Sequence, residues 1–470
     1  MPADSKHPSY EHGAAKWSRC RDAVAGQDAV HMAGEKYLPK LKDQSKEDYD
    51  AYKCRATYFN ATGRTLDGLV GMIFRKAPVV VMPAAMEDIA NDIDLAGTTL
   101  IGQAEKVVRE VLDVGRIGLL VEFPVVVEQP SNLAQAAAQN LRPYTSTYQA
   151  ESIINWKSAR VNNVMQLVLV VLSEDYEVSN DGFESKMEKQ LRVLSLTETG
   201  YQQQLYRKND RGEWVPEGDP IIPLNKGKPL SFIPFYAFGP NSNDLMVQEP
   251  PLLDLVDLNL AHYRVSADYE HGCHFTGLPM LFIAGVQLKE GENVSLGSQT
   301  ALVTDSPAPG ADGKFIEFTG QGLGALENNL KSKENQMAAI GARMLEQQKA
   351  GVESEGAMQL RSNGETSVLA SIANLVSQSF TRMLAFMAEW ADVKGDISIA
   401  LNTDFMPKGM TAQELSELTK AMQAGAISFE TYFENLQRGE IIRGDKTVEE
   451  EKEQIADDGT PLGGADDGND

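Results

Sequence analysis

The sequence predicts an α+β fold, in which helical stretches and antiparallel strands occupy different parts of the chain. Three observations lead to this prediction. Helical periodicity is clear at 45–75 and at 100–114, short apolar runs separated by turn residues fill 153–238, and long helical stretches return after Pro250. We expect strands at 116–123, 153–156, 165–172, 192–197, 201–207 and 231–238.

The composition limits the functions that the chain can have. Its 470 residues are enough for roughly two to four domain-sized units, and its formal net charge is −24. Proteins that hold duplex DNA tightly rely on Lys and Arg, so we do not expect a DNA binder of that type. Two interpretations of the charge stay open: it keeps the protein in solution, or it forms an acidic wall past which DNA slides.

The sequence shows no pattern for secretion, membrane insertion or catalysis. Its first residues lack an apolar signal-peptide core, and no apolar run approaches the roughly 20 residues that span a bilayer. Cys20, Cys54 and Cys273 are widely spaced, which predicts a reducing compartment. Neither a GxxxxGK[ST] phosphate loop nor a GxSxG motif occurs, so we expect no catalytic residue, no metal and no cofactor.

The stretch from 250 to 350 organises the chain. A helix is expected to begin at Pro250 and Pro251 and to end in the glycine-bearing stretch 272–279. Short β-prone runs follow at 279–285, 299–304 and 314–319. A second helix then begins near Leu326 and ends at Gly351, with an apolar stripe made of Leu326, Leu330, Met337, Ile340 and Met344.

On either side of this stretch the pattern is weaker. Residues 1–44 are polar and are expected to be irregular. Residues 351–365 are expected to form a polar loop, at whose end Ser362 and Glu365 have the spacing of a capping box for a helix at 366–391. A strand at 397–401 and two further helices follow, and the acidic residues 448–470 cannot bury enough apolar surface to become ordered.

Taken in order, these segments resemble the portal proteins of tailed bacteriophages. RPYTSTYQAESIINW and LSFIPFYAFGP are similar to the wing of a portal subgroup, PPLLDLVDLNLAHYRVSADYEHGCHFTGLP to its first stem helix, and ENNLKSKENQMAAIGARML to its second. The resemblance implies a portal fold with a wing at 1–248, stem helices at 249–275 and 326–350, a small α/β clip at 276–325, a tunnel loop at 351–365, a long wing helix with a returning strand at 366–405, a helical crown at 406–447 and an acidic disordered tail at 448–470.

The resemblance also implies a function. Portals are homo-oligomeric rings, usually of twelve copies, at one capsid vertex of the virion, and they are assembled in the host cytoplasm. DNA enters through the channel during packaging and leaves through it during ejection, without sequence-specific contacts. The implied partners are the terminase large subunit, head-completion and tail adaptor proteins, and the major capsid and scaffolding proteins.

Positions in the implied domains suggest the residues that meet these partners. Tunnel-loop residues facing DNA would be Glu353, Glu355, Met358, Gln359 and Arg361. Stem residues in the channel would be Lys331, Arg343 and Lys349. Clip residues in contact with terminase and adaptor would be Lys289, Glu290, Asp305, Asp312 and Lys314.

Several alternatives stay open. Arg343, Lys349 and Arg361 either form belts that face phosphates or pair with neighbouring glutamates. His271, Cys273 and His274 are interpreted as a helix end rather than a metal site, and Gly320, Gly322 and Gly324 as a hinge rather than a dinucleotide turn. At the level of function, the alternatives are another structural neck or capsid-vertex protein, and a soluble enzyme with an unrecognised site.

Overall fold

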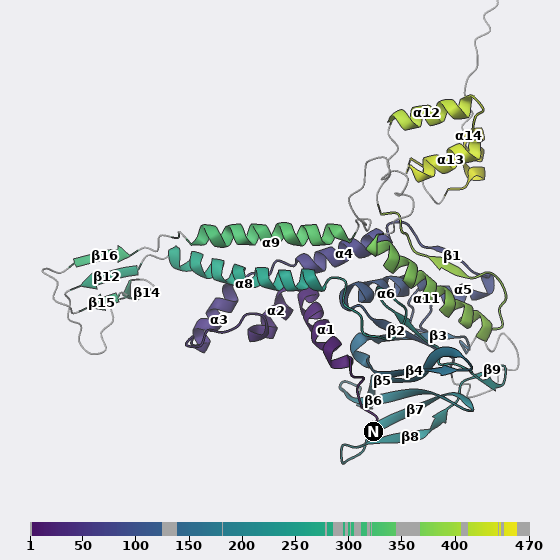
Figure 1. The fold of residues 1–470 in the computed structure, drawn as a ribbon, viewed down its shortest axis with the longest axis horizontal. Coiled ribbons are helices and arrows are strands. Elements are labelled where there is room, and N and C mark those ends of the chain that lie inside the picture. The colour runs from purple at the N-terminus through teal and green to yellow at the C-terminus, as the bar shows by residue number, and fades with distance from the viewer. Residues whose placement is uncertain are drawn as a thin grey trace, which may run out of the picture. The chain divides into compact units, whose positions relative to one another are not determined.

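The computed structural model describes residues 2–124, 139–180, 182–277, 280–284, 295–296, 299–300, 302–304, 312–316, 320, 322–344, 367–405, 412–439, 441–442 and 446–457. The chain divides into two compact units, Met1–Thr403 and Asp404–Asp470. Helices and mainly antiparallel sheets are both present, which confirms the α+β prediction (Figure 1).

The N-terminal region is helical, and the prediction that 1–44 is irregular is wrong. It forms α1 (Tyr10–Ala25), α2 (Gln27–Ala33) and the short 3-10 helix η1 (Gly34–Lys36). The apolar residues Trp17, Cys20 and Ala23 recur at helical spacing and are fully buried. This spacing stabilises α1 although most residues between them are polar.

The helical region expected at 45–75 consists of two helices, α3 (Lys46–Arg55) and α4 (Ala61–Ile73). The break between them has a local cause. Asn60 caps α4, because its side-chain oxygen accepts a hydrogen bond of 2.9 Å from the backbone nitrogen of Gly63. Ser45 caps α3 in the same way through the nitrogen of Asp48.

The next segment leads into the central sheet. It comprises β1 (Val79–Val81), the 3-10 helix η2 (Ala84–Met86), α5 (Glu87–Asn91), α6 (Leu100–Val114) and β2 (Ile117–Glu122). The helix predicted at 100–114 is confirmed at both ends. Thr99 caps its first turn, and Gly115 ends it with a φ of 75°, a left-handed conformation that glycine adopts readily.

Two antiparallel sheets follow. In the first, β2 lies between β3 (Tyr144–Gln149) and β11 (Phe235–Phe238). After the short 3-10 helix η3 (Ala150–Ser152), the second sheet has five strands in sequence order: β4 (Ile153–Val161), β5 (Val164–Asn180), β6 (Ser185–Thr197), β7 (Gly200–Lys208) and β8 (Trp214–Ile221). A small ribbon of β9 (Leu224–Asn225) and β10 (Lys228–Pro229) comes next.

All the predicted strands are present in these sheets, but β3, β8 and the two short strands β9 and β10 were not predicted. In β8 the residues Pro216, Gly218 and Pro220 have the composition of a loop. Proline lacks a backbone N–H and is tolerated at the edge of a sheet, and β8 is an edge strand. In β3 the sequence YTSTYQ is polar along its length, so it does not show the alternation of apolar and polar residues that predicts a strand.

The central helices are α8 (Leu253–Thr276) and α9 (Leu323–Arg343). Two predicted helix starts were wrong. The first helix begins after Pro250 and Pro251 rather than at them, and the second begins three residues before Leu326. The first helix ends at Thr276, inside the stretch 272–279 where its end was predicted. Gly272 does not end α8, because it lies inside the helix where Leu323 approaches closely.

The segment between these helices forms a small mixed sheet. Its strands are β12 (Met280–Ala284), β13 (Ser295–Leu296), β14 (Gln299–Thr300), β15 (Leu302–Thr304) and β16 (Asp312–Ile316). The order is β15-β12-β16, in which β12 pairs with β15 in parallel and with β16 antiparallel. The three runs predicted to be β-prone each contain strand residues.

The last part of the first unit is α11 (Val368–Trp390) followed by β17 (Ser398–Ala400), which pairs with β1. The residue that caps α11 is Ser367, whose hydroxyl accepts a hydrogen bond from the nitrogen of Ala370. The capping box expected at Ser362 and Glu365 lies outside the described residues.

The second unit contains α12 (Ala412–Gln423), α13 (Phe429–Arg438) and α14 (Val448–Asp457). The expectation of disorder from 448 onward is wrong for α14. Thr447 and Glu450 form a reciprocal capping box, in which each side chain accepts a hydrogen bond from the other's backbone nitrogen. Three glutamates in the first turn also complement the helix dipole.

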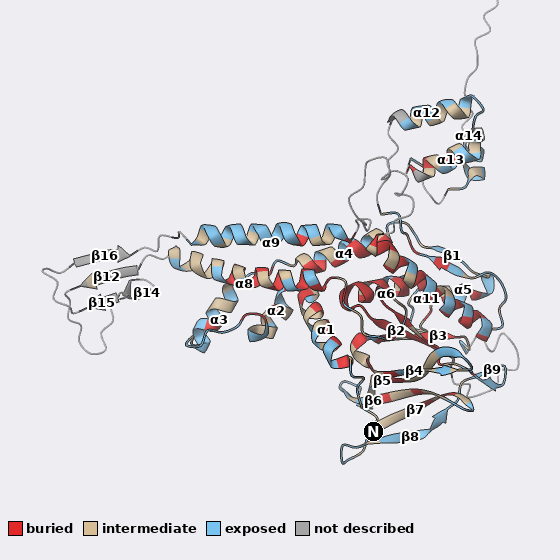
Figure 2. Cartoon of the chain, viewed as in Figure 1, coloured by how far each residue is buried: buried red, intermediate tan, exposed pale blue. Residues whose placement is uncertain are grey.

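The core of the first unit lies where α1, α4, α6 and α11 meet the sheets, as the buried colouring in Figure 2 shows. Within it Arg116 is only 1% exposed. Its guanidinium lies 4.0 Å from the ring centre of Trp156 and 5.8 Å from that of Trp17. These aromatic faces stabilise the buried cation, while burial lowers the pKa of Arg116 to about 9.

Candidate functional site

The candidate site is built on the hairpin of α8 and α9. The two helices run antiparallel, since Gly272 near the end of α8 faces Leu323 at the start of α9, and His262 faces Glu334 further along. A Cβ atom added at Gly272 would lie only 2.6 Å from a Leu323 side-chain carbon. The absence of a side chain at Gly272 therefore allows the helices to approach closely at this end.

Further along, a hydrogen bond between His262 and Glu334 connects the two helices. His262 Nε2 lies 3.3 Å from Glu334 Oε1, and the His262 side chain is almost fully buried. Burial lowers the pKa of His262, and the Glu334 carboxylate opposes this shift only in part. The pair therefore acts mainly as a hydrogen bond with a neutral imidazole.

Buried polar contacts fix α8 to the body of the unit. The Asn259 side chain is fully buried and makes three hydrogen bonds. Its oxygen accepts from the backbone nitrogen of Thr62 at 3.0 Å and from the Thr62 hydroxyl at 2.9 Å, and its nitrogen donates to the carbonyl of Phe59 at 2.8 Å. These bonds hold α8 against the first turn of α4.

The apolar stripe predicted for α9 is confirmed. Of its members, Met337 and Met344 are buried and the other three are partly buried, whereas the intervening polar residues are mostly exposed. The C-terminal part of α9 approaches α4, where Gly341 lies against Thr65. Helix α9 therefore uses one narrow face for contacts within its own chain.

The described stem candidates lie on the other faces of α9. Lys331 is exposed, and its ammonium pairs with Glu327 one turn earlier at 2.6 Å, which raises the pKa of Lys331. Arg343 is exposed in the last turn. Lys349 lies outside the described residues. The structure thus brings Lys331 and Arg343 to the solvent side of one helix, and their role stays a prediction.

The predicted tunnel-loop residues, Glu353, Glu355, Met358, Gln359 and Arg361, also lie outside the described residues, but the two ends of their segment are described. The backbone nitrogen of Leu369 donates a hydrogen bond of 3.2 Å to the carbonyl of Met344. A cavity of about 250 Å³ beside these ends is lined by Pro250, Pro251 and Val368 among others. The segment therefore leaves and re-enters the fold at one place.

Of the clip candidates, Lys289, Glu290 and Asp305 are outside the described residues. Asp312 and Lys314 belong to β16, where their backbones pair with Ala284 and Phe282 of β12. The structure places this strand at an edge of the three-stranded sheet.

The residues weighed as a metal site lie in the last turns of α8. His274 Nε2 is 3.1 Å from the guanidinium of Arg55, and the His271 ring packs against Tyr52 and Phe275. Across the described ranges, no three His, Cys, Asp or Glu side chains lie close enough to hold a metal ion. In the glycine-bearing turn before α9, Gly320 has a positive φ of 64° and Gly322 caps the helix.

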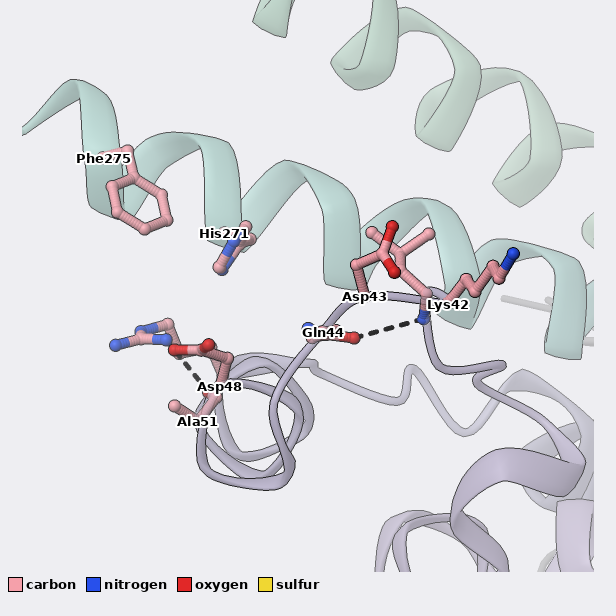
Figure 3. Close-up of a pocket in the computed structure, with 9 residues that line it drawn as sticks. Lys42, Asp43, Gln44, Asp48, Ala51, His271 and Phe275 are labelled. Atoms are coloured by element: carbon pink, nitrogen blue, oxygen red, sulfur yellow. Dashed lines mark hydrogen bonds between the residues drawn. The ribbon is translucent and has the colours of Figure 1, made fainter.

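One feature that the sequence did not reveal is a pocket beside α8. Figure 3 shows it between the C-terminal half of α8 and the loop and helix at 41–55. Its volume is about 520 Å³. Residues more than 200 positions apart along the chain meet there, so no local pattern identifies it.

Comparison with known proteins gives one family match. Residues 251–391, from α8 through α11, match a family described as a domain of unknown function (DUF4055). No curated protein matches the chain. Within the described part of the chain, no helix has the length and apolarity that crossing a membrane requires.

Three solved structures illustrate the structural similarities. They are described as the neck of a native GTA particle computed with C12 symmetry (12% identity, TM-score 0.34), the virion of a native gene transfer agent particle (11%, 0.33) and the neck of an empty GTA particle computed with C6 symmetry (12%, 0.37). Each similarity covers 87% of this chain and 97% of the other. TM-scores this low do not establish a common fold.

Proposed function

We propose that this chain is the subunit of a portal, a homo-oligomeric ring at one capsid vertex of a tailed-phage-type virion. DNA passes through the ring during packaging and ejection. Helices α8 and α9 form the stem, the strands between them form the clip, and the segment that joins α9 to α11 is the tunnel loop. The twelvefold copy number expected from the portal resemblance is part of the proposal.

The observation that carries this proposal is the exposure of α9. Among its 21 residues only Met337 is buried, whereas α11 buries 14 of its 23 (Figure 2). Most helices in proteins are stabilised by packing an apolar face, and a helix that is polar over most of its circumference needs another reason to form. Side-by-side packing with α8–α9 pairs of neighbouring copies supplies that reason.

The charge of α9 supports a channel wall that does not hold DNA tightly. Its five charged side chains are three cations and two carboxylates, which nearly cancel, and Lys331 is already paired with Glu327. Uncharged residues such as Asn328, Ser332 and Gln336 are exposed between them. Tight binding of a duplex requires several unpaired cations against its phosphates. A surface of this kind in a chain of net charge −24 lets the duplex slide.

The proposal gives the chain a structural rather than a catalytic role. The terminase large subunit supplies the energy for packaging and binds the clip. Head-completion and tail adaptor proteins also bind the clip, and capsid and scaffolding proteins surround the ring. Asp312 and Lys314 of β16 are the described clip residues proposed for the first of these contacts.

Single-particle electron microscopy of the purified protein tests this proposal. We expect rings with a central hole, and symmetry counting of the class averages gives the number of copies. Lysine or arginine belts would appear as density facing the hole at the level of α9. Assemblies without a hole would support another neck or vertex component, and a monomer at every protein and salt concentration would contradict the proposal.

A further inference from the structure

Residues 2–9, which we call the N-terminal strap, are attached to β4 at the edge of the five-stranded sheet. The backbone nitrogen of His7 donates a hydrogen bond of 2.9 Å to the carbonyl of Ile154. The carbonyl of Ser5 accepts a hydrogen bond of 2.7 Å from the side chain of Asn155. Because β4 is an edge strand, these bonds cover part of a backbone edge that the sheet leaves unpaired. The strap therefore has a defined docked position.

The ring of His7 adds a stacking contact to this attachment. Its centre lies 3.9 Å from that of the Trp156 ring, and the two planes are 16° from parallel. The guanidinium of Arg116 lies 4.0 Å from the centre of the same indole ring. Two groups at this separation would overlap on one face, so His7 and the buried Arg116 cover opposite faces of Trp156. The docked strap thus leaves Trp156 only 5% exposed.

The hydrogen bonds of His7 require a neutral ring. The backbone nitrogen of Ser9 donates a hydrogen bond of 3.2 Å to His7 Nδ1, and the Ser9 hydroxyl lies 2.7 Å from the same atom. A backbone N–H can only donate, so Nδ1 carries a free lone pair and the ring proton is on Nε2. A proton on Nδ1 would remove this acceptor and leave the Ser9 nitrogen without it.

The charges around the strap also disfavour a protonated His7. Burial and the Arg116 cation both lower the pKa of His7. Asp244 favours the charged form of Arg116, whose pKa is still lowered by burial to about 9, so Arg116 keeps its charge at neutral and acid pH. His7 forms no ion pair with a described residue. The charged groups on the neighbouring elements pair with one another, Lys6 with Glu11 and Glu151 with Arg21.

We infer that the N-terminal strap is a pH-sensitive element, docked on β4 when His7 is neutral and released when His7 gains a proton. The proton breaks the bond from Ser9 and places two cations on opposite faces of one indole ring. Docking lowers the pKa of His7 below its ordinary value of 6.5, so docking is complete above that pH and is lost as the pH falls below it. Every contact lies within one chain, so the inference does not depend on the proposed ring.

Hydrogen exchange of the full-length protein, measured by mass spectrometry, tests this inference. Exchange in the peptide that covers residues 1–10 is measured at about pH 7.5 and about pH 5.5, on either side of the ordinary histidine pKa. Each rate is divided by that of the same synthetic peptide at the same pH, which removes the intrinsic pH dependence of exchange. We expect the protection of this segment to fall several-fold at the lower pH, while that of α6 is unchanged.

Substitutions of His7 separate its titration from its contacts. His7→Asn does not titrate, and its side-chain oxygen can accept from the nitrogen two residues later, as His7 Nδ1 does. His7→Phe also does not titrate and keeps a ring against Trp156. Each variant should show equal protection of the strap at both pH values. His12 is exposed in the first turn of α1, so His12→Asn is the matched control and should keep the response of the wild type.

Three results would overturn the inference. The first is equal protection of the strap in the wild type at both pH values. The second is a pH response in His7→Asn and His7→Phe as large as that of the wild type, since another group would then be responsible. The third is a loss of protection at the lower pH that extends evenly into α6, which would indicate general acid unfolding. Thermal melts at both pH values verify that each variant is folded.

Discussion

At the scale of single residues, the buried polar groups determine how α8 meets the body. Asn259 is the clearest case, since it is fully buried and satisfied by three hydrogen bonds to the chain around the start of α4. A buried polar side chain costs free energy unless its partners are in place. The side chain of Asn259 therefore favours one register between α8 and α4 over shifted ones.

Replacement of Asn259 by leucine tests this role. Asn259→Leu removes all three bonds and leaves the Thr62 nitrogen and the Phe59 carbonyl without this partner, so we expect the free energy of unfolding to fall by about 3 kcal/mol. Urea unfolding followed by tryptophan fluorescence measures this change. Thr62→Val keeps the shape and removes one of the three bonds to Asn259, and a loss of about 1 kcal/mol is expected. Equal losses in the two variants would show that Asn259 has no special role.

At the scale of elements, the sequence predicts helices best where an apolar stripe and a capping residue occur together. Helix α6 has both, with Thr99 and Gly115 at its ends, and its predicted bounds are correct. The stripe of α9 was identified from periodicity alone, and its first residue was misplaced because the glycines before it give no clear start signal. Helix α1 was missed because Trp17, Cys20 and Ala23 are spaced among charged residues.

Other parts of the structure depend on contacts between distant residues and leave no local signal. The pocket beside α8 joins residues 41–55 to residues 271–275, and each segment alone is an ordinary polar or helical stretch. The bonds of Asn259 to the α4 region are equally invisible in sequence. By contrast, the capping box of Thr447 and Glu450 was present in the sequence, but the surrounding acidic composition outweighed it in the prediction of disorder.

The attachment of α9 to α8 gives a prediction for a whole element. Met337 is the one buried residue within α9, at 2% exposed. Met337→Ala removes most of its buried side chain, and we expect a cost of about 2–3 kcal/mol concentrated on this helix. Hydrogen exchange measured by mass spectrometry should show loss of protection in 323–343 and little change in 368–390.

The neighbouring residue provides the control for this experiment. Gln336 is exposed, so Gln336→Ala should leave the exchange of α9 unchanged. Loss of protection spread evenly over the first unit in Met337→Ala would mean that α9 does not open as a separate element. It would also weaken the interpretation of α9 as a helix that depends on neighbouring copies.

At the scale of the whole molecule, the hydrogen bond between Met344 and Leu369 closes the segment 345–366 at its two ends. We therefore expect changes within this proposed tunnel loop to leave ring assembly unaffected. The carbonyl of Met344 and the nitrogen of Leu369 are hydrogen-bonded at 3.2 Å, and Ser367 caps α11 independently of the residues before it. Both ends of the segment are thus fixed by groups outside it. Substitutions or deletions inside the segment should alter its contacts with DNA in the proposed channel without altering the contacts of α9 and α11.

Deletion of Ala357–Ser362 tests this separation. Shortening the closed segment changes its closure entropy by only a few tenths of a kcal/mol, so we expect rings of unchanged symmetry in electron micrographs. The deletion removes three of the proposed DNA-facing side chains, Met358, Gln359 and Arg361, and we expect particles assembled with this variant to package or retain less DNA. A variant with Gly and Ser in place of 357–362 keeps the length and separates the role of side chains from that of reach. Wild-type levels of packaged and retained DNA in both variants would show that the loop has no role in packaging or retention. Broken rings would show that the loop contributes to assembly in spite of the hydrogen bond between Met344 and Leu369.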